Sequence, residues 1–454
     1  MPLDQSSLHD LLDHACGRHR VPGATLAVLS DDAVSLAATG VLHRGTGVPV
    51  TPDSLFQIGS ITKVWTTTLL AQLVAEGRLG FDTPVVDVLP DFRVADPEVS
   101  RAVTVRHLVT HTSGIDGDVF TDTGRGDDCV ARYVAACADV EQNHPLGATL
   151  SYCNTGFVIA GRLIEVLTDQ IWDRALRERL IEPLGLIHTV TLPEEALRFR
   201  TAMGHVADPR RQPEPAPVWC LPRAAGPAGL ICASATDLLE FARMHLRGGH
   251  GPEGQEILGS DLVAEMQRVQ AEVPNPQWLA DHWGLGWFLS DWDGVTTYGH
   301  NGGTIGQYAF LTVDPGHRVA VVMLTNGGDA SAAYMEVAGS LFAELCDVSV
   351  PRFAPPDPPP AVDGAAHAGI YERHGVRITI RATADGMTAR TESTGEMVDI
   401  SPPVDYELTP VREDLWAARD EPDGLWAAMS FYTLDGGRRY VHFGGRATPK
   451  TADA

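Results

Sequence analysis

The segment Gly59-Ser60-Ile61-Thr62-Lys63 places a serine three residues before a lysine. Lysine occurs at only two of the 454 positions, 63 and 450, whereas 32 positions carry arginine. Arginine stays protonated in proteins, but a desolvated lysine can lose its proton near neutral pH. We therefore interpret Lys63 as an amine that acts as a base.

The residues after this segment predict a buried helix. The stretch 64–76 has no proline or glycine, ends before Gly77, and carries apolar residues over most of its circumference. Residues three apart on a helix share a face, so Ser60 and Lys63 project together. A serine is a poor nucleophile until a base takes its proton, and burial lowers the pKa of a lysine enough for that role. The alternative, a capping serine beside an exposed lysine, is commoner for the tetrapeptide taken alone.

Two further motifs favour the nucleophilic interpretation. The segment Ser151-Tyr152-Cys153-Asn154 precedes a predicted helix at 157–167. Residues two apart on an extended turn point the same way, so Tyr152 can pass a proton while Asn154 holds a substrate carbonyl or amide. The segment Tyr298-Gly299-His300-Asn301-Gly302-Gly303 leads into strand-like sequence. Its glycines allow a substrate to approach the backbone closely, and His300 supplies a donor or a cation.

In this order and at these separations, the three motifs resemble the serine β-lactamase and penicillin-binding-protein superfamily. The similar branch contains class C β-lactamases, D-stereospecific peptidases and related esterases and transacylases. The resemblance covers roughly residues 7–345, and the matching motifs are Ser60-x-x-Lys63, Tyr152-x-Asn154 and His300-x-Gly302. It implies an α+β fold, with a β-lactamase/transpeptidase-like antiparallel sheet flanked by helices and an all-helical lobe.

The resemblance also implies a role for each motif residue. Ser60 forms the acyl-enzyme, Lys63 deprotonates Ser60, and Tyr152 shares the proton transfer. Asn154 holds the acyl side of the substrate. The backbone N–H groups of Ser60 and Gly303 form the oxyanion hole.

The third motif departs from the family pattern. His300, which the resemblance places among the catalytic residues, stands where most true β-lactamases and cell-wall transpeptidases have lysine. Gly302 lies beside it and contributes to substrate binding. The departure disfavours penicillin hydrolysis and favours a peptidase, an esterase or an acyl transferase.

Composition excludes several function classes. The net charge of −25 argues against nucleic acid and anionic membranes as partners. The opening residues lack a basic region and an apolar core, and no apolar run approaches the ~18 residues of a membrane span, so we expect a cytoplasmic location. Seven cysteines without a C-x-x-C pair do not predict a disulfide framework. The 17 histidines form no ligand pattern, so neither a metal nor a cofactor is expected.

The character of the sequence changes after the predicted catalytic domain, residues 1–347. In this domain, an opening hairpin and the strand-like stretch 287–326 are expected to join in one antiparallel sheet. Residues 348–364 are rich in proline and predict a stiff linker. Residues 365–454 alternate with period two, which predicts a small all-β domain, and the family resemblance implies a lipocalin-like barrel. Its predicted hairpin turns are Asp385-Gly386, Asp423-Gly424 and Asp435-Gly436.

A barrel after a proline-rich linker, in a chain without a secretory signal, resembles the stand-alone penicillin-binding-protein-type thioesterases of nonribosomal peptide assembly. The resemblance implies a peptidyl thioester substrate, with an acyl or peptidyl carrier protein as a candidate partner. It also implies a D-residue at the acyl end and closure of a macrolactam by the peptide's own amine. We predict that Arg446, near the end of the barrel, orients a substrate terminus or carboxylate. The alternative for Arg446 is a solvated side chain near the tail.

Two other functions stay open. A D-stereospecific peptidase or esterase would use water instead of an amine to release the acyl group. A penicillin-type ligand sensor would bind without turnover, although the intact set of Ser60, Lys63 and Tyr152 argues against a pure binder. The sequence predicts neither the length of the peptide nor the ring size, and it leaves the oligomeric state open.

Overall fold

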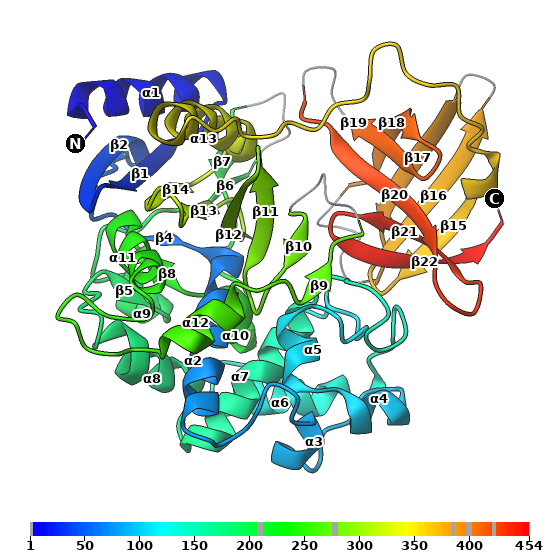
Figure 1. Cartoon of the computed structure of the whole chain (residues 1–454), viewed down its shortest axis with the longest axis horizontal. Helices are drawn as coiled ribbons and strands as arrows, with labels where there is room; N and C mark the ends of the chain where they lie inside the picture. The colour runs from blue at the N-terminus through cyan, green and yellow to red at the C-terminus, as the bar shows by residue number, and fades with distance from the viewer. Residues whose placement is uncertain are drawn as a thin grey trace.

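A large antiparallel sheet, the helices around it and a closed β-barrel make up the computed structural model (Figure 1). The structure describes residues 3–206, 212–274, 280–383, 386–395, 402–419 and 424–453. Within these residues the sheet has nine strands in the order β3-β2-β1-β14-β13-β12-β11-β10-β9, and eight strands close the barrel. The predicted antiparallel sheet, flanking helices and C-terminal barrel are therefore all present.

The sheet joins segments from the two ends of the catalytic part of the chain. β1 (Gly23–Ser30) and β2 (Ala33–His43) form the opening hairpin, and β1 pairs antiparallel with β14 (Val319–Thr325). This pairing confirms that the opening hairpin and the late strands share one sheet. The other strands of the sheet are β3 (Val48–Pro49), β9 (Ala271–Glu272), β10 (His282–Trp283), β11 (Phe288–Trp292), β12 (Val295–Gly303) and β13 (Tyr308–Asp314).

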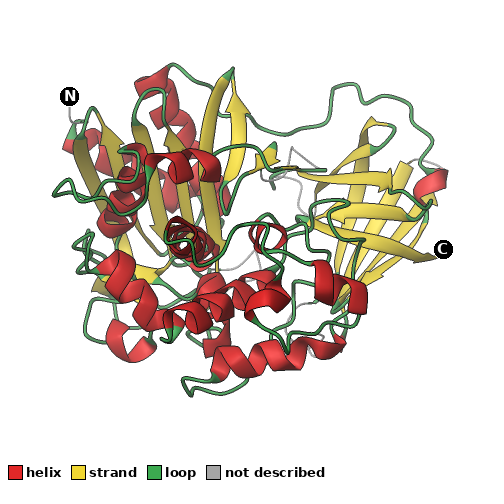
Figure 2. Ribbon diagram, turned by 60° about the horizontal axis from the view of Figure 1, so that its bottom comes forward, coloured by secondary structure: helices red, strands yellow, loops and turns green. Residues whose placement is uncertain are grey.

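Helices cover both faces of this sheet (Figures 1 and 2). Successive side chains of a strand point to opposite faces. Leu26 of β1 therefore packs beneath α1 (Gln5–Arg18) and α13 (Ala330–Cys346), whereas Leu29 faces the larger core on the other side. Since both faces are apolar, the sheet is held between two layers of helices.

The larger core is built around α2 (Thr62–Ala75), which follows the serine segment. Nearly all of its side chains are buried, and it packs beside α7 (Asn154–Thr168). It ends before Gly77, whose φ of 69° suits glycine, as the sequence predicted. The other helices are α3 (Val85–Val88), α4 (Pro97–Ala102), α5 (Val105–Val109), α6 (Cys129–Ala136), α8 (Trp172–Leu176), α9 (Pro193–Ala196), α10 (Gly226–Gly229), α11 (Ala235–Leu246) and α12 (Ser260–Met266).

Short strands and turns complete the helical part of the chain. The short strands are β4 (Phe56–Gln57), β5 (Thr189–Val190), β6 (His205–Val206), β7 (Glu214–Pro215) and β8 (Cys232–Ala233). In the part of the chain that the structure describes, none of the helices combines the length and apolarity that crossing a membrane requires.

The final strands close a barrel whose interior is filled by side chains. Tyr371 and Trp416 are among the buried residues packed there, as expected for a barrel of this size. The predicted turn Asp435-Gly436 joins β20 to β21, whereas Asp385 and Asp423 of the other predicted turns lie outside the described residues. The barrel strands are β15 (Gly369–Arg373), β16 (Val376–Thr383), β17 (Gly386–Ser393), β18 (Val404–Arg412), β19 (Leu415–Arg419), β20 (Ala427–Thr433), β21 (Arg439–Phe443) and β22 (Arg446–Ala452).

The barrel lies beside the helical layer, and a long segment leads to it from the end of α13 (Figures 1 and 2). This segment carries one short 3-10 turn, Ala365–His367, just before β15. Most of the hydrogen bonds and ion pairs between the barrel and the rest of the chain reach residues 116–118 and 149–152, beside the segment that carries Tyr152 and Asn154.

Candidate active site

Ser60 and Lys63 meet at the start of the central helix. Ser60 lies in a 3-10 turn, Gly59–Ile61, immediately before α2. The Nζ atom of Lys63 lies 3.0 Å from Ser60 Oγ and donates to the Ala228 carbonyl oxygen at 2.6 Å. Burial, and then the charge of Arg446, hold the pKa of Lys63 well below its usual value. The lowered pKa makes the neutral form of the amine easier to reach, and in that form its lone pair can accept the Ser60 proton across this contact.

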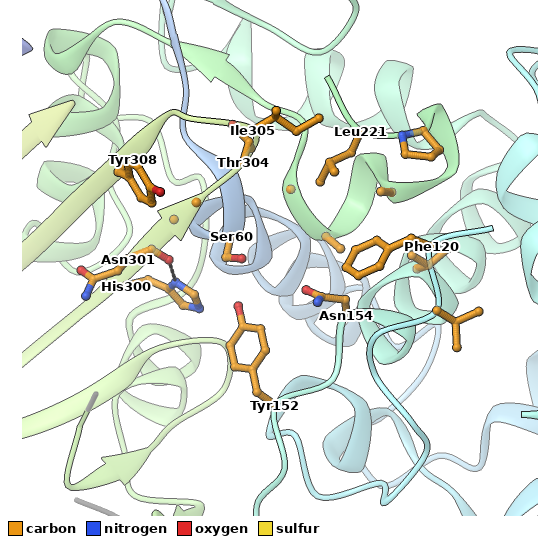
Figure 3. A pocket seen from close by; sticks show the side chains of 18 of the residues that line it. Ser60, Phe120, Tyr152, Asn154, Leu221, His300, Asn301, Thr304, Ile305 and Tyr308 are labelled. Atoms are coloured by element: carbon orange, nitrogen blue, oxygen red, sulfur yellow. Dashed lines mark hydrogen bonds between the residues drawn. The ribbon is translucent and has the colours of Figure 1, made fainter. Parts of the chain in front are cut away.

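Tyr152 completes a group of three around the serine. Its hydroxyl points toward Ser60 (Figure 3). Burial raises the pKa of Tyr152 above its usual value despite the neighbouring Ser60 hydroxyl, so the phenol stays protonated and can relay a proton but not act as the resting base. The His111 ring stacks on Tyr152 with centroids 4.1 Å apart, and the backbone N–H of Tyr152 donates to the Gly445 carbonyl of the barrel at 2.8 Å.

His300 lies on β12 beside Tyr152 and lines the same pocket (Figure 3). Its Nδ1 is 2.6 Å from the carbonyl oxygen of Asn301. A carbonyl can only accept, so Nδ1 carries the proton. Burial lowers the pKa of His300 to about 3, which leaves Nε2 as a lone pair, buried and without a hydrogen-bond partner among the described residues. This corrects the expectation that His300 offers a donor or a cation to substrate.

Close backbone contacts place the end of β12 against Ser60. A Cβ on Gly302 would lie 2.9 Å from the Ser60 nitrogen and 1.9 Å from the Ile58 carbonyl oxygen. A Cβ on Gly59, whose φ is +51°, would lie 2.6 Å from the nitrogen of Gly303. Only glycine fits at these positions, and the approach brings the Ser60 and Gly303 nitrogens to one end of the pocket.

Asn154 is held by a carboxylate that the sequence did not single out. Its Nδ2 donates to Asp118 Oδ1 at 3.1 Å. Arg446 also binds Asp118, through Nε at 3.1 Å and Nη2 at 2.9 Å, and its guanidinium carbon lies 4.8 Å from the centroid of the Tyr152 ring. Arg446 therefore reaches the site from the barrel and is not a solvated tail residue. Asp118 carries no motif signal, because its partners are remote in the sequence.

These residues surround a pocket of about 520 Å³. One wall carries the reacting groups, Ser60, Tyr152 and His300, and faces a wall that includes Phe120 and Leu221 (Figure 3). The other aliphatic and phenylalanine side chains of the lining are Val119, Val158, Pro222, Ala225, Ala228, Ile305 and Phe310. The pocket can thus hold an apolar acyl chain against the serine.

One group of side chains among the described residues has the spacing of a metal site: the Asp314, His317 and Cys346 ligand atoms lie within 4.8 Å of one another. Asp314 and His317 are already paired at 2.7 Å. The group lies at the far end of β13 from Tyr308, which lines the pocket, and six residues of strand span ~20 Å. It is therefore remote from Ser60 and has no place in the chemistry of this site.

A serine beside a buried neutral lysine and a phenol is the arrangement of a serine acyltransferase or hydrolase. The chain belongs to the beta-lactamase family, because the family model described as Beta-lactamase matches residues 8–342. Penicillin-binding protein 4 of Amycolatopsis lactamdurans is 52% identical to the chain over 378 residues, which are 83% of this chain and 99% of that protein.

Three other similarities cover different shares of the chain. A crystal structure of SurE matches 98% of this chain and 99% of its own, with 30% identity and a TM-score of 0.78. A structure described as SurE with D-Leu matches with 29% identity and a TM-score of 0.76. Unguisins hydrolase ungD' of Aspergillus campestris is 26% identical over 336 residues, 72% of this chain and 62% of that protein. The full-length match to SurE confirms the predicted β-lactamase-like fold with its C-terminal barrel.

Proposed function

We propose that this chain forms an acyl-Ser60 intermediate from a peptidyl thioester and releases a head-to-tail cyclic peptide in nonribosomal peptide biosynthesis. The observation that carries the proposal is the buried amine of Lys63, which has a lowered pKa and lies 3.0 Å from the Oγ of Ser60, a residue that lines a pocket of about 520 Å³. The similarity to SurE extends over the whole chain, barrel included. The D-Leu in one SurE structure supports a D-residue at the acyl end.

In the acylation step, Ser60 Oγ attacks the thioester carbonyl while Lys63 takes its proton. The C–O bond forms and the C–S bond breaks. The thiolate leaves with a proton from the Tyr152 hydroxyl, which the protonated Lys63 replaces. The N–H groups of Ser60 and Gly303 face the carbonyl oxygen as it becomes negative, and such donors are worth ~3 kcal/mol each.

In the release step, the N-terminal amine of the same peptide attacks the ester carbonyl. The C–N bond forms, the ester C–O bond breaks, and the proton of the amine returns to Ser60 Oγ through Lys63. An amine tethered at the other end of the acyl chain competes with water through its high effective concentration. The apolar wall with Phe120 and Leu221 supports this outcome, because it limits access of water to the ester.

The uncharged ring of His300 at the third motif favours a thioester substrate over one that places a carboxylate there. His300 presents a lone pair there, and a lone pair repels a carboxylate. Arg446 has five N–H donors, of which three bind Asp118 and Gly444. The remaining two have no hydrogen-bond partner among the residues that the structure describes, and they can orient a terminus or side-chain carboxylate of the peptide, the role that we propose for Arg446.

The test mixes the purified protein with a peptidyl thioester that ends in a D-residue and follows the product masses. A product lighter than the linear acid by one water, absent with Ser60→Ala, is expected. The thioester of the L-epimer is the matched control and should react more slowly. Linear acid as the sole product would refute cyclisation. We propose that a carrier protein delivers the thioester, so kcat/KM should be higher for the carrier-bound peptide than for a small-thiol thioester.

A D-stereospecific peptidase or esterase is the second candidate. It is favoured by the similarity to unguisins hydrolase, whose name denotes hydrolysis. Acyl-enzyme formation is the same in both functions, and only the attacking group differs. The product mass in the experiment above separates the two, because water yields the linear acid and the internal amine yields the ring.

A further inference from the structure

The barrel reaches the active site mainly through one carboxylate, that of Asp118. Its side chain is 17% exposed and accepts from two arginines of the barrel. Arg446 binds both oxygens, and Nη1 of Arg373 lies 2.9 Å from Oδ2. The third partner is the Asn154 amide, which belongs to the motif beside Ser60. Asp118 thus links two barrel arginines to a proposed substrate-binding side chain.

This link fixes which way the Asn154 amide is turned. An ionised carboxylate can only accept hydrogen bonds, so the NH₂ group of Asn154 must face Asp118. The amide oxygen and the second N–H are then available to the pocket that Asn154 lines. Without the Asp118 carboxylate, the Asn154 side-chain amide could flip. Its oxygen and nitrogen would then exchange the positions that they present to the substrate.

The barrel also holds the backbone around this motif. The Gly445 carbonyl accepts from the Tyr152 N–H at 2.8 Å, and the N–H of Ala447 donates to Ser151 Oγ at 3.1 Å. These bonds come from the turn and the first residues of β22. The segment that carries Tyr152 and Asn154 is therefore bound on one side by the barrel.

We propose that Asp118, neutralised by Arg373 and Arg446, is the positioning residue through which the barrel completes the catalytic site. The group formed by Asp118, Arg373 and Arg446 holds Asn154 in its substrate-binding orientation. Because the arginines compensate the charge of Asp118, the Lys63 amine does not face an uncompensated negative charge. The barrel is thus part of the catalytic unit. This inference rests on the proposed acylation of Ser60 by way of Lys63, but not on cyclisation.

The electrostatic part of the proposal has a definite sign. An isolated carboxylate beside Lys63 would favour the ammonium form and raise the pKa of Lys63, whereas the nearby Arg446 lowers it. The arginines also hold the pKa of Asp118 below its usual value despite its burial, so its charge persists and needs compensation. The groups that face Lys63 are Ser60, His111, Asp118, Tyr152, Cys153, His300 and Arg446.

The experiment measures how fast a fluorophosphonate probe labels Ser60 between pH 5 and 10, with intact mass as the readout. The probe needs an activated serine but no particular peptide, and the acid limb of the rate reports the pKa of the base. The variants are Asp118→Asn, Arg373→Gln and the double variant. Arg373 does not line the pocket. Arg377→Gln is the matched control, because Arg377 pairs with Glu372 on the barrel. Thermal unfolding checks that each variant folds.

Removing charges of opposite sign should move the acid limb in opposite directions. We expect Arg373→Gln to shift it up by about half a pH unit and Asp118→Asn to shift it down by about as much, the effect of one partly screened charge. The double variant restores the net charge and should return the limb to the wild-type position. Shifts in the same direction, or an Arg373→Gln profile equal to that of Arg377→Gln, would overturn the proposal. A wild-type protein not labelled at Ser60 would instead overturn the proposed function as well.

Discussion

Replacing Gly302 with alanine should disable acylation while leaving the protein folded. The added Cβ would lie 1.9 Å from the Ile58 carbonyl oxygen and 2.9 Å from the Ser60 nitrogen, whereas real Cβ atoms essentially never come within 3.0 Å of such neighbours. Both neighbours are backbone atoms, so no side-chain rotation relieves the clash. The end of β12 and the turn that carries Ser60 must therefore separate by about 1 Å.

This separation opens the proposed oxyanion hole, whose two N–H groups lie on opposite sides of the contact. Losing one such donor costs about 3 kcal/mol of transition-state stabilisation, which corresponds to about 100-fold or more in rate. We expect kcat for thioester consumption to fall by this factor, whereas KM should change by less than about threefold, because the carbonyl oxygen is bound more tightly in the transition state. The assay follows release of the free thiol with a chromogenic thiol reagent.

Gly303→Ala is the control for this prediction. A Cβ there would meet only the Tyr308 ring, at 3.6 and 3.7 Å, and alanine keeps the backbone N–H. We expect it to lose less than about tenfold in kcat. A Gly302→Ala protein with wild-type kcat would refute the placement of the oxyanion hole between β12 and Ser60, and equal losses in the two variants would do the same.

Three further predictions concern charge and packing. Lys63→Met should abolish thioester consumption yet stabilise the fold at neutral pH, because the pKa of Lys63 is far lower in the folded state than in the unfolded chain. Between those two pKa values the unfolded chain binds more protons than the folded chain, so the stability of the wild-type protein rises with pH. Urea midpoints measured from pH 6 to 10 should therefore increase with pH more steeply for the wild type than for Lys63→Met. Equal slopes would contradict a lowered pKa for the buried amine. Nitrogen NMR of imidazole-labelled protein at pH 7 should find His300 protonated on Nδ1 alone, and a cationic ring would contradict the lone pair. Gly161→Ala should destabilise by about 1–3 kcal/mol, since its Cβ would lie 2.2 Å from Pro227 Cγ; Gly339→Ala, with open space around it, should not lower the urea midpoint.

Features that depend on neighbours in the sequence could be predicted. The absence of proline and glycine between 64 and 76 predicted α2, and the period-two alternation after 365 predicted barrel strands. The spacing of Ser60 and Lys63 predicted their contact, because three residues on a helix return to one face. Each of these patterns reflects a periodicity that the backbone itself imposes.

Features that depend on remote partners could not be predicted in the same way. Asp118 meets Arg446 across 328 positions, and nothing around Asp118 in the sequence distinguishes it from a surface acid. His300 was predicted as a donor or cation from its residue type alone. Its charge state depends on the Asn301 carbonyl and on burial, which only the folded chain supplies.

The turn between β21 and β22 limits which residues of the barrel can be substituted. Gly444 and Gly445 have φ values of 58° and 77°, a conformation that other residues rarely adopt, and it directs the Gly445 carbonyl to the Tyr152 N–H. Because this bond uses only main-chain atoms, most barrel side chains can drift without breaking it. Directed evolution toward other acyl groups should therefore diversify Phe120 and Leu221 on the pocket wall. Libraries should keep the two glycines and Arg446 fixed. If the barrel is exchanged for that of a related protein, the turn between its last two strands should be transferred with it.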